Sequence, residues 1–321
     1  MTEPLPSCWV VTEGIAGTEN QCLGVAEAMG IAPVVKRIRL RFPWKQLSPW
    51  LGIGHGLSLA AGSDPIAPPW PDLVLASGRK AVGIGLHVKQ KSGGRSFLVN
   101  IQDPRLAPAR FDLVVVPQHD KIRGENVMVT TAGLHRVTPK RLAEARAAWQ
   151  ERLAALPAPR VAVLIGGNSR AHEMTPENAK SLAAQLQRLA GEGAGLMVTA
   201  SRRTGPENAR ILRDALAGSG NAFFWDESGD NPYFAFLALT DYIIVTEDSV
   251  SMTSEAISTG KPVLVAGLSG GAARLDAFHR LLQAQGYTRP FTGALEAWSY
   301  DPPNDTIKVA ERIRAEMKGR M

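Results

Sequence analysis

The sequence predicts an α/β fold: two Rossmann-like, doubly wound domains, each a parallel sheet flanked by helices. Short β-branched runs alternate with amphipathic helical stretches along nearly the whole chain. The length of 321 residues suits two domains, each large enough to bury its own core. In the second half a Pro-Glu-Asn-Ala quartet occurs at residues 176–179 and again at 206–209. This repeat indicates two successive strand–loop–helix units of the same kind.

The first predicted domain covers residues 1–157. Helices are expected at Asn20–Met29, after Ser77-Gly78, and at Arg141–Leu156, where apolar residues fall on one helical face. The sequence Pro157-Ala158-Pro159 then predicts a stiff linker. The expected strands are short apolar runs: Cys8–Thr12, Val34–Leu40, Asp72–Ala76, Ser96–Asn100, Leu113–Val116 and Asn126–Val129.

The second predicted domain covers residues 158–304. Each Pro-Glu-Asn-Ala quartet is expected to begin a helix, because proline is tolerated at the first helical position and glutamate suits the positive end of the helix dipole. A last helix is expected at Thr306–Met321. The expected strands are Val161–Ile165, Gly195–Thr199, Ala222–Trp225, Tyr242–Val245 and Pro262–Ala266.

The composition narrows the classes of function. The chain has 36 basic and 30 acidic residues, a net charge of +6, which favours anionic partners such as phosphates or anionic lipid headgroups. It contains no signature of a nucleic-acid-binding module. The apolar runs are too short to span a membrane, and the N-terminus does not have the layout of a signal peptide, so a cytoplasmic location is expected. Cys8 and Cys22 predict buried packing, not a disulfide framework or a zinc site.

Ligands of open parallel sheets bind beyond the carboxyl ends of the strands, so the loops that follow strands are searched first. The loop after the strand ending at Ile165 carries two glycines, two polar residues and an arginine, a combination that suits a phosphate. A sharp turn between strand and helix explains the same residues equally well. This candidate loop is Gly166, Gly167, Asn168, Ser169 and Arg170.

Two further loops of the second half are candidates for the same ligand. In the first, Ser201 and Arg202 precede a helix. The adjacent arginines Arg202 and Arg203 favour an anionic ligand at this position. The alternative is that both are solvated surface side chains. The second follows Val245 and has six hydroxyl or carboxylate side chains between Glu247 and Ser254, more than capping of the next helix requires. Its candidate ligand-binding residues are Glu247, Asp248, Ser249, Ser251 and Glu255.

The first half offers candidates for the acceptor and for catalysis. The loop after the first strand contains Gly14 and Gly17 but has neither the dinucleotide-binding nor the P-loop pattern. Glu19 in this loop is a candidate general base, and capping a helix is its alternative role. His119 and Asp120 follow a buried strand and are further catalytic candidates, with a structural histidine as the alternative. Arg79 and Lys80 are candidate clamps for a phosphorylated acceptor.

Residues 36–51 mix five cations with Phe42, Trp44, Trp50 and Leu51. Tryptophan beside lysine and arginine suits the headgroup region of an anionic bilayer, although two prolines argue against a regular amphipathic helix. The alternative is that the aromatic side chains pack inward and the charges are merely solvated. The hypothesis is a peripheral contact with the inner face of a membrane.

The segments at residues 117–120 with 126–139, 163–170, 198–208 and 230–262 resemble the bacterial members of the mitochondrial-fission Elm-type family. This family is similar to the GT-B glycosyltransferases, in which two Rossmann-like domains face each other across a cleft. The resemblance implies that the second domain holds a nucleoside-diphosphate sugar and the first domain the acceptor. It further implies that residues 305–321 pack back on the first domain.

The resemblance also implies roles for individual residues. Gly166, Gly167 and Arg202 would meet the diphosphate, and Ser249, Ser251 and Glu255 would meet phosphate and ribose. The Gly-Gly-x-Gly-Gly-His loop of the related peptidoglycan enzyme is absent from this sequence, and Glu19 corresponds only loosely to the catalytic glutamate of the lipid A enzyme.

The sequence therefore predicts a metal-independent glycosyltransferase that uses a sugar nucleotide as substrate and no cofactor. The absence of an Asp-x-Asp motif agrees with a reaction in which arginines or a helix N-terminus stabilise the leaving diphosphate. The acceptor is expected to be lipid-linked. Two alternatives stay open: a sugar-nucleotide epimerase on the same scaffold, and a non-catalytic membrane-associated scaffold.

Overall fold

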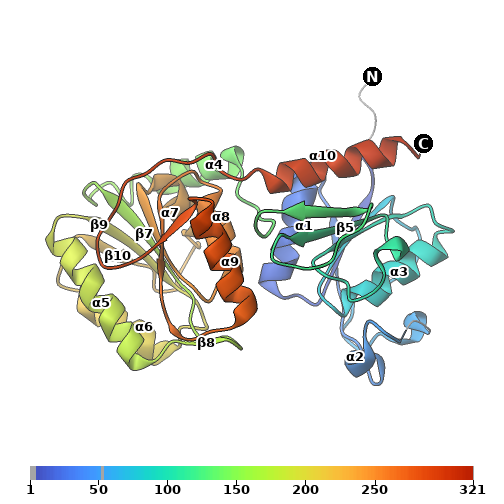
Figure 1. Cartoon of the computed structure of the whole chain (residues 1–321), viewed down its shortest axis with the longest axis horizontal. Helices are drawn as coiled ribbons and strands as arrows, with labels where there is room; N and C mark the ends of the chain where they lie inside the picture. The colour runs from blue at the N-terminus through green and yellow to red at the C-terminus, as the bar shows by residue number, and fades with distance from the viewer. Residues whose placement is uncertain (1–4, 52–53, 321) are drawn as a thin grey trace. The chain divides into compact units, whose positions relative to one another are not determined.

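The computed structural model describes residues 5–51 and 54–320 (Figure 1). Contacts within the chain divide it into two units. Unit 1 consists of the residues up to Arg136 together with those from Asn304 onward, and unit 2 of Val137–Pro303. Each unit contains a six-stranded sheet in which every pair of neighbouring strands is parallel, as the sequence predicted.

The sheet of unit 1 has the strand order β2-β1-β3-β4-β5-β6. Its central strands are buried on both faces, which explains why they are nearly continuous apolar runs. β2 ends at Arg37, three residues earlier than expected. The strands are β1 (Cys8–Thr12), β2 (Val34–Arg37), β3 (Leu73–Ser77), β4 (Phe97–Ile101), β5 (Leu113–Pro117) and β6 (Val127–Thr130).

Helices cover both faces of this sheet. Helix α1 packs against α10, and Val309, Ala310 and Ile313 of α10 share a buried cluster with Cys8 and Val10 of β1. Helix α3 lies over the other face, against a second buried cluster. The helices are α1 (Ala16–Ala28), α2 (Trp44–Leu47), α3 (Ala81–Lys91) and α10 (Asp305–Lys318), with short 3₁₀ turns at residues 55–57 and 108–110.

The sheet of unit 2 has the strand order β10-β9-β7-β11-β12-β14. β14 and the small antiparallel pair β8 (His172–Glu173) and β13 (Ser269–Gly270) were not predicted from the sequence, because these short strands are not apolar runs. The main strands are β7 (Arg160–Ile165), β9 (Gly195–Ala200), β10 (Ala222–Phe224), β11 (Tyr242–Thr246), β12 (Val263–Ala266) and β14 (Thr288–Pro290).

Both Pro-Glu-Asn-Ala quartets begin helices, as predicted, but the two helices are capped differently. Thr175 and Asn178 form a reciprocal capping box at the start of α5, whereas Gly205 with φ of 80° precedes α6. The helices of unit 2 are α4 (Pro139–Trp149), α5 (Pro176–Gly191), α6 (Pro206–Leu216), α7 (Tyr233–Leu239), α8 (Val250–Ile257) and α9 (Ala273–Ala284).

The division between the units falls at Arg136, earlier than the expected boundary at Pro157. The reason is that α4 packs on α7 and therefore belongs to unit 2. Helix α4 also ends at Trp149, and the residues up to Leu156 form turns. The last helix, α10, lies in unit 1.

Both cysteines are buried and form no disulfide. Burial raises the pKa of the Cys8 thiol to about 12 and raises the pKa of Cys22 further. Because a thiolate is the reactive form, both residues act as inert core packing, as the sequence predicted.

Candidate functional site

The candidate site of unit 2 lies where the strand order reverses. β7 has β9 on one side and β11 on the other, so the chain leaves β7 toward one half of the sheet and later returns to β11 on the opposite side. The loops after β7 and β11 therefore diverge, and such a switch point is where open parallel sheets bind ligands. The predicted loops at Gly166 and Glu247 follow these two strands.

Hydrogen bonds tie the loops after β7, β9 and β11 into one frame around Gly166. The Gly166 amide donates to Thr246 Oγ1 at 2.7 Å. Its carbonyl oxygen accepts from the hydroxyls of Ser201 and Thr204. Residues from three segments far apart in the sequence thus hold one another at the carboxyl edge of the sheet.

The two glycines are required by packing inside this frame. A Cβ at Gly166 would lie 2.3 Å from both carboxylate oxygens of Asp248. Gly167 has φ of 141°, and a Cβ there would lie 2.3 Å from the Arg203 carbonyl oxygen. The close packing at Gly166 and the positive φ of Gly167 are those of a sharp turn between strand and helix, which was one of the two interpretations of these glycines.

Asp248 is a structural element of the frame. Its side chain is completely buried and accepts a hydrogen bond of 2.6 Å from Thr246 Oγ1. Arg203 Nη1 lies 2.7 Å from Asp248 Oδ2. The sequence predicts Asp248 as a ligand-binding residue; in the structure its carboxylate has no exposed surface and holds Arg203.

Two arginines remain at the surface of this frame. Arg170 and Arg202 are exposed, and their side chains make no hydrogen bond or ion pair with any described residue. Asn168 and Ser169 are used locally: Asn168 Oδ1 accepts from Met174 N, and Ser169 Oγ accepts from Ala171 N and His172 N. Of this predicted loop, Arg170 is the side chain that presents charge to solvent.

Helix α8 begins at the same rim. Ser249 caps it by accepting from Met252 N at 3.3 Å, and Ser251 lies partly exposed in its first turn. Glu255 is one turn further in and is buried, with its carboxylate accepting a hydrogen bond from the Tyr233 hydroxyl at the start of α7. Burial, and secondarily the Glu255 charge, raise the pKa of Tyr233 well above its usual range, so the phenol stays protonated as a donor.

Glu247 lies between two buried histidines that the sequence analysis missed. His172 Nε2 is 3.5 Å from Glu247 Oε1, and His279 Nε2 lies 2.7 Å from the Glu247 carbonyl oxygen, to which it donates. Burial lowers the pKa of His279. His279 is 32 residues away from Glu247, and no local sequence pattern predicts the contact.

No three acidic, histidine or cysteine side chains in residues 5–51 and 54–320 are grouped to hold a metal ion.

The predicted residues of unit 1 that follow β1 and β3 lie at the corresponding switch point, between these two strands. Glu13, after β1, pairs with Lys80 at the start of α3. Glu19 receives two hydrogen bonds from Arg37, of 3.1 and 2.7 Å. Helix α1 begins at Ala16, four residues earlier than expected. Gly17 and Glu19 consequently lie in its first turn.

The remaining acceptor-side candidates, Gly14 and Arg79, lie in the same loops as Glu13 and Lys80, and the remaining catalytic candidates lie after β5. Gly14 has φ of 78° in the turn that precedes α1, and Arg79 follows β3. His119 and Asp120 form a turn after β5. The Arg123 guanidinium closes this turn by donating to the Gln118 and Asp120 carbonyl oxygens.

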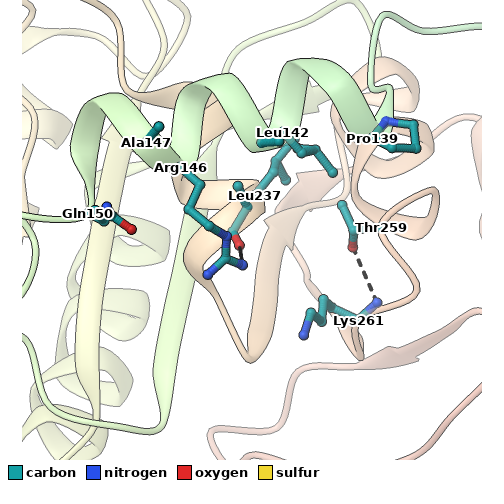
Figure 2. A pocket seen from close by; sticks show the side chains of 10 residues that line it. Pro139, Leu142, Arg146, Ala147, Gln150, Leu237, Thr259 and Lys261 are labelled. Atoms are coloured by element: carbon teal, nitrogen blue, oxygen red, sulfur yellow. Dashed lines mark hydrogen bonds between the residues drawn. The ribbon is translucent and has the colours of Figure 1, made fainter.

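A separate cavity of about 420 Å³ lies between α4, the end of α7 and the segment before β12 (Figure 2). Arg146 reaches across it to donate to the Ala238 carbonyl oxygen, and Thr259 Oγ1 accepts from Lys261 N at 3.2 Å. It contains none of the residues selected from the sequence. Because α7 ends just before β11, this cavity lies at the amino edge of the sheet, opposite the candidate site.

Comparison with known proteins places the chain in a family. Residues 16–317 match the family described as mitochondrial fission ELM1. The chain belongs to this family. It is 28% identical to the mitochondrial fission protein ELM1 of Arabidopsis thaliana over 388 aligned residues, which cover 97% of this chain and 91% of the plant protein.

Solved structures show that this member of the ELM1 family has the GT-B fold. It is similar to the UDP-GlcNAc 2-epimerase of Neisseria meningitidis bound to UDP-GlcNAc, with a TM-score of 0.52, 15% identity and coverage of 96% of this chain and 100% of the epimerase. The UDP-GlcNAc 2-epimerase of Methanocaldococcus jannaschii gives a TM-score of 0.53 at 11% identity, with coverage of 96% and 99%. At such identities the likeness concerns the fold alone.

Proposed function

We propose that the chain binds a nucleoside-diphosphate sugar at the carboxyl edge of the unit 2 sheet and transfers the sugar without a metal ion. The observation that carries this proposal is the frame around Gly166, which holds three strand-end loops together at the switch point. The frame leaves Arg170 and Arg202 exposed and without a partner among the described residues. A fixed frame with two available guanidinium groups suits a diphosphate.

The proposed chemistry requires stabilisation of the charge that develops on the leaving diphosphate. Arg170 and Arg202 supply positive charge there, and the start of α8, capped by Ser249, adds the positive end of a helix dipole. The ion pair between the buried Asp248 carboxylate and Arg203 keeps the loops in place before the ligand binds. Such preorganisation lowers the reorganisation needed when the bond to the sugar breaks.

The ribose of the nucleotide is proposed to donate hydrogen bonds to Glu255. This carboxylate is already oriented by the Tyr233 hydroxyl, so its position does not depend on the ligand. A uridine nucleotide is the first ligand to test, because the similar Neisseria enzyme is bound to UDP-GlcNAc.

The acceptor and the base are proposed to lie on unit 1. Glu19 is a candidate base whose carboxylate is held by Arg37, and His119 with Asp120 is the other candidate. Arg79 and Lys80 remain candidate clamps for a phosphorylated acceptor. Lys80 is paired with Glu13, so an acceptor phosphate would have to replace this ion pair.

Thermal unfolding with UDP tests the binding site. Ligand at ~100 times its dissociation constant stabilises a protein by ~2.7 kcal/mol, which corresponds to a rise in Tm of roughly 5–10 °C. The wild type should show this rise, and Arg170→Gln with Arg202→Gln should lose most of it. The matched control is Arg188→Gln with Arg210→Gln, on the exposed faces of α5 and α6. An equal loss in the control, or no rise in the wild type, contradicts the proposed site.

A pair of variants separates ribose binding by Glu255 from a structural role. Tyr233→Phe removes the hydrogen bond between these side chains, whereas Glu255→Gln removes the carboxylate but keeps an amide oxygen that can accept from the Tyr233 hydroxyl. If Glu255 binds ribose, the glutamine variant loses the UDP effect and the phenylalanine variant keeps it. Equal behaviour of the two variants would show that Glu255 only orients α8 against α7.

Incubation with radiolabelled UDP-sugars separates the proposed transferase from its alternatives. Release of UDP with transfer of label to an acceptor supports the transferase, and change of the sugar with the nucleotide still attached supports an epimerase. UDP binding with neither reaction supports a non-catalytic scaffold.

A second observation favours docking on an anionic membrane. Phe42, Leu47, Trp50 and Leu57 are large apolar side chains with 48–76% of their surface exposed, and they lie close together in the sequence around α2. The neighbouring cations Arg41 and Lys45 are exposed. Trp44 packs inward against the core below α3, so the aromatic residues of this segment divide between core and solvent. No helix in the described ranges is long and apolar enough to cross a bilayer.

Sedimentation with vesicles tests the docking. We expect the wild type to bind vesicles containing anionic phospholipid at low salt, and Phe42→Ser with Trp50→Ser to reduce the bound fraction strongly. Val129→Ser with Ile307→Ser removes exposed apolar residues elsewhere on unit 1 and should have little effect. If the wild type does not bind the vesicles, the proposed docking on an anionic membrane is wrong.

A further inference from the structure

Unit 1 contains a groove of about 1000 Å³ at the amino edge of its sheet. It is lined by residues just before β1 and β3, by the start of β4, and by the last turns of α10. Because the strands are parallel, this edge is opposite the one that carries Gly14, Glu19, Arg79 and Lys80. The groove is therefore separate from the proposed acceptor side.

The floor of the groove is apolar. Met29, Ile31 and Phe97 are buried beneath it, and Met317 of α10 is partly exposed along its side. Leu5 lies at its edge with 62% of its surface exposed. Because the three floor residues are already buried, the apolar surface that an alkyl chain would cover in the groove comes from Leu5 and Met317, and covering it is favourable.

The rim of the groove is basic. Its described lining includes Arg95, Arg314, Lys318 and Arg320 but a single acidic residue, Asp72. Asp72 Oδ2 already accepts from the Ser7 amide and hydroxyl, at 2.9 and 2.7 Å. The cations near the end of α10 also suit the negative end of the helix dipole, but this explains neither Arg95, which lies outside the helix, nor the apolar floor.

One of these guanidinium groups is held in place over the floor. Arg320 pairs with the buried carboxylate of Asp112 and stacks on the Phe97 ring, with 4.8 Å between the guanidinium carbon and the ring centroid. Asp112 is itself fixed by Lys89 and by the Leu98 amide. A guanidinium has five N–H donors, so Arg320 retains donors for a ligand after binding Asp112.

We propose that this groove binds a single-chain anionic lipid, with its acyl chain against Leu5 and Met317, next to the buried Met29, and its phosphate or carboxylate headgroup among the basic side chains. The volume is at the upper end of the range typical of small-molecule pockets. The apolar floor and the basic rim together match the two ends of such a molecule.

Methyl NMR of the full chain with labelled methionines and decyl phosphate, below its micelle concentration, tests the proposal. The Met29 and Met317 methyl signals should shift, whereas those of Met174 and Met197, buried in unit 2, should not. Affinity should rise from octyl to decyl phosphate by up to about fourfold per methylene. Inorganic phosphate and the zwitterionic decyl phosphocholine should bind far more weakly.

Matched charge variants of α10 complete the test. Arg314→Gln with Lys318→Gln should weaken decyl phosphate binding at least tenfold, because charge-assisted hydrogen bonds are lost. Lys308→Gln with Arg312→Gln changes the same charge on the same helix outside the groove and should stay within about twofold. Unmoved Met29 and Met317 signals, equal weakening in both variants, or equal binding of inorganic phosphate would each overturn the proposal.

Discussion

The two units have the same kind of parallel sheet and a switch point each, but they treat charge there in opposite ways. In unit 1 the pairs Glu13–Lys80 and Glu19–Arg37 neutralise the candidate residues, and each pair is partly exposed. In unit 2 the carboxylate of the Asp248–Arg203 pair is completely buried, and Arg170 and Arg202 remain without a described partner.

The ion pairs in the unit 1 loops can therefore be replaced by a ligand, whereas the Asp248 carboxylate in unit 2 is part of the core. Partly exposed ion pairs contribute little to stability, so a ligand can replace them at small cost. A buried carboxylate that loses its partners is costly, so the frame around Gly166 is fixed before any ligand arrives. We therefore expect substitutions in the frame to affect folding and substitutions in unit 1 to affect mainly ligand exchange.

The largest expected effect comes from adding a methyl group to each switch-point loop. Gly166→Ala should lower the free energy of unfolding by about 2–4 kcal/mol, because the new Cβ would collide with the buried Asp248 carboxylate. Gly14→Ala should cost about 1–2 kcal/mol from its positive φ, since its nearest neighbour is the flexible Arg37 side chain at 3.5 Å. Urea unfolding of both variants measures the difference, and equal losses would break the comparison.

A smaller effect is expected when one carboxylate in each unit is neutralised. Asp248→Asn should cost about 1–3 kcal/mol, because the new amide group replaces an acceptor that holds Arg203 and Thr246. Glu13→Gln should cost less than about 1 kcal/mol, because the Lys80 pair is partly exposed. Chemical denaturation at low and high salt measures both values. A larger loss for Glu13→Gln would reverse the assignment of the two pairs.

The smallest effect concerns pH. Burial lowers the pKa of His279 in unit 2, so the unfolded chain takes up this proton more readily than the folded one. Stability should consequently fall as pH decreases below about 6.5, the usual histidine value, and be unaffected by this group above it. His279→Gln, which keeps a donor for the Glu247 carbonyl oxygen, should reduce the loss between pH 7.5 and 5.5.

The matched variant in unit 1 is His87→Gln. Burial, followed by Lys91, also lowers the pKa of His87, but this side chain is less deeply buried than His279. Its substitution should reduce the pH dependence less. Thermal unfolding across the pH range checks both, and an unchanged slope in His279→Gln would show that His279 does not titrate differently on folding.

The sequence by itself determined the fold class and nearly all the main strands. Parallel strands buried on both faces must be short continuous apolar runs, and such runs are visible at β1, β7 and β11 without any knowledge of contacts. Proline at the start of α5 and α6 marked helix starts for an equally local reason. The carboxyl ends of these strands then placed Gly166, Ser201 and Glu247 at one edge of the sheet.

Only the tertiary structure decided which of these side chains face inward. Asp248 and Arg170 are both charged loop residues, yet one is buried against Gly166 and the other exposed, because burial depends on which loops pack together. The contact of His279 with Glu247, the pairing of the three-residue β14 with β12, and the packing of α4 on α7 are likewise long-range. Local periodicity carries no information about such contacts, which follow from how the strands and helices are assembled.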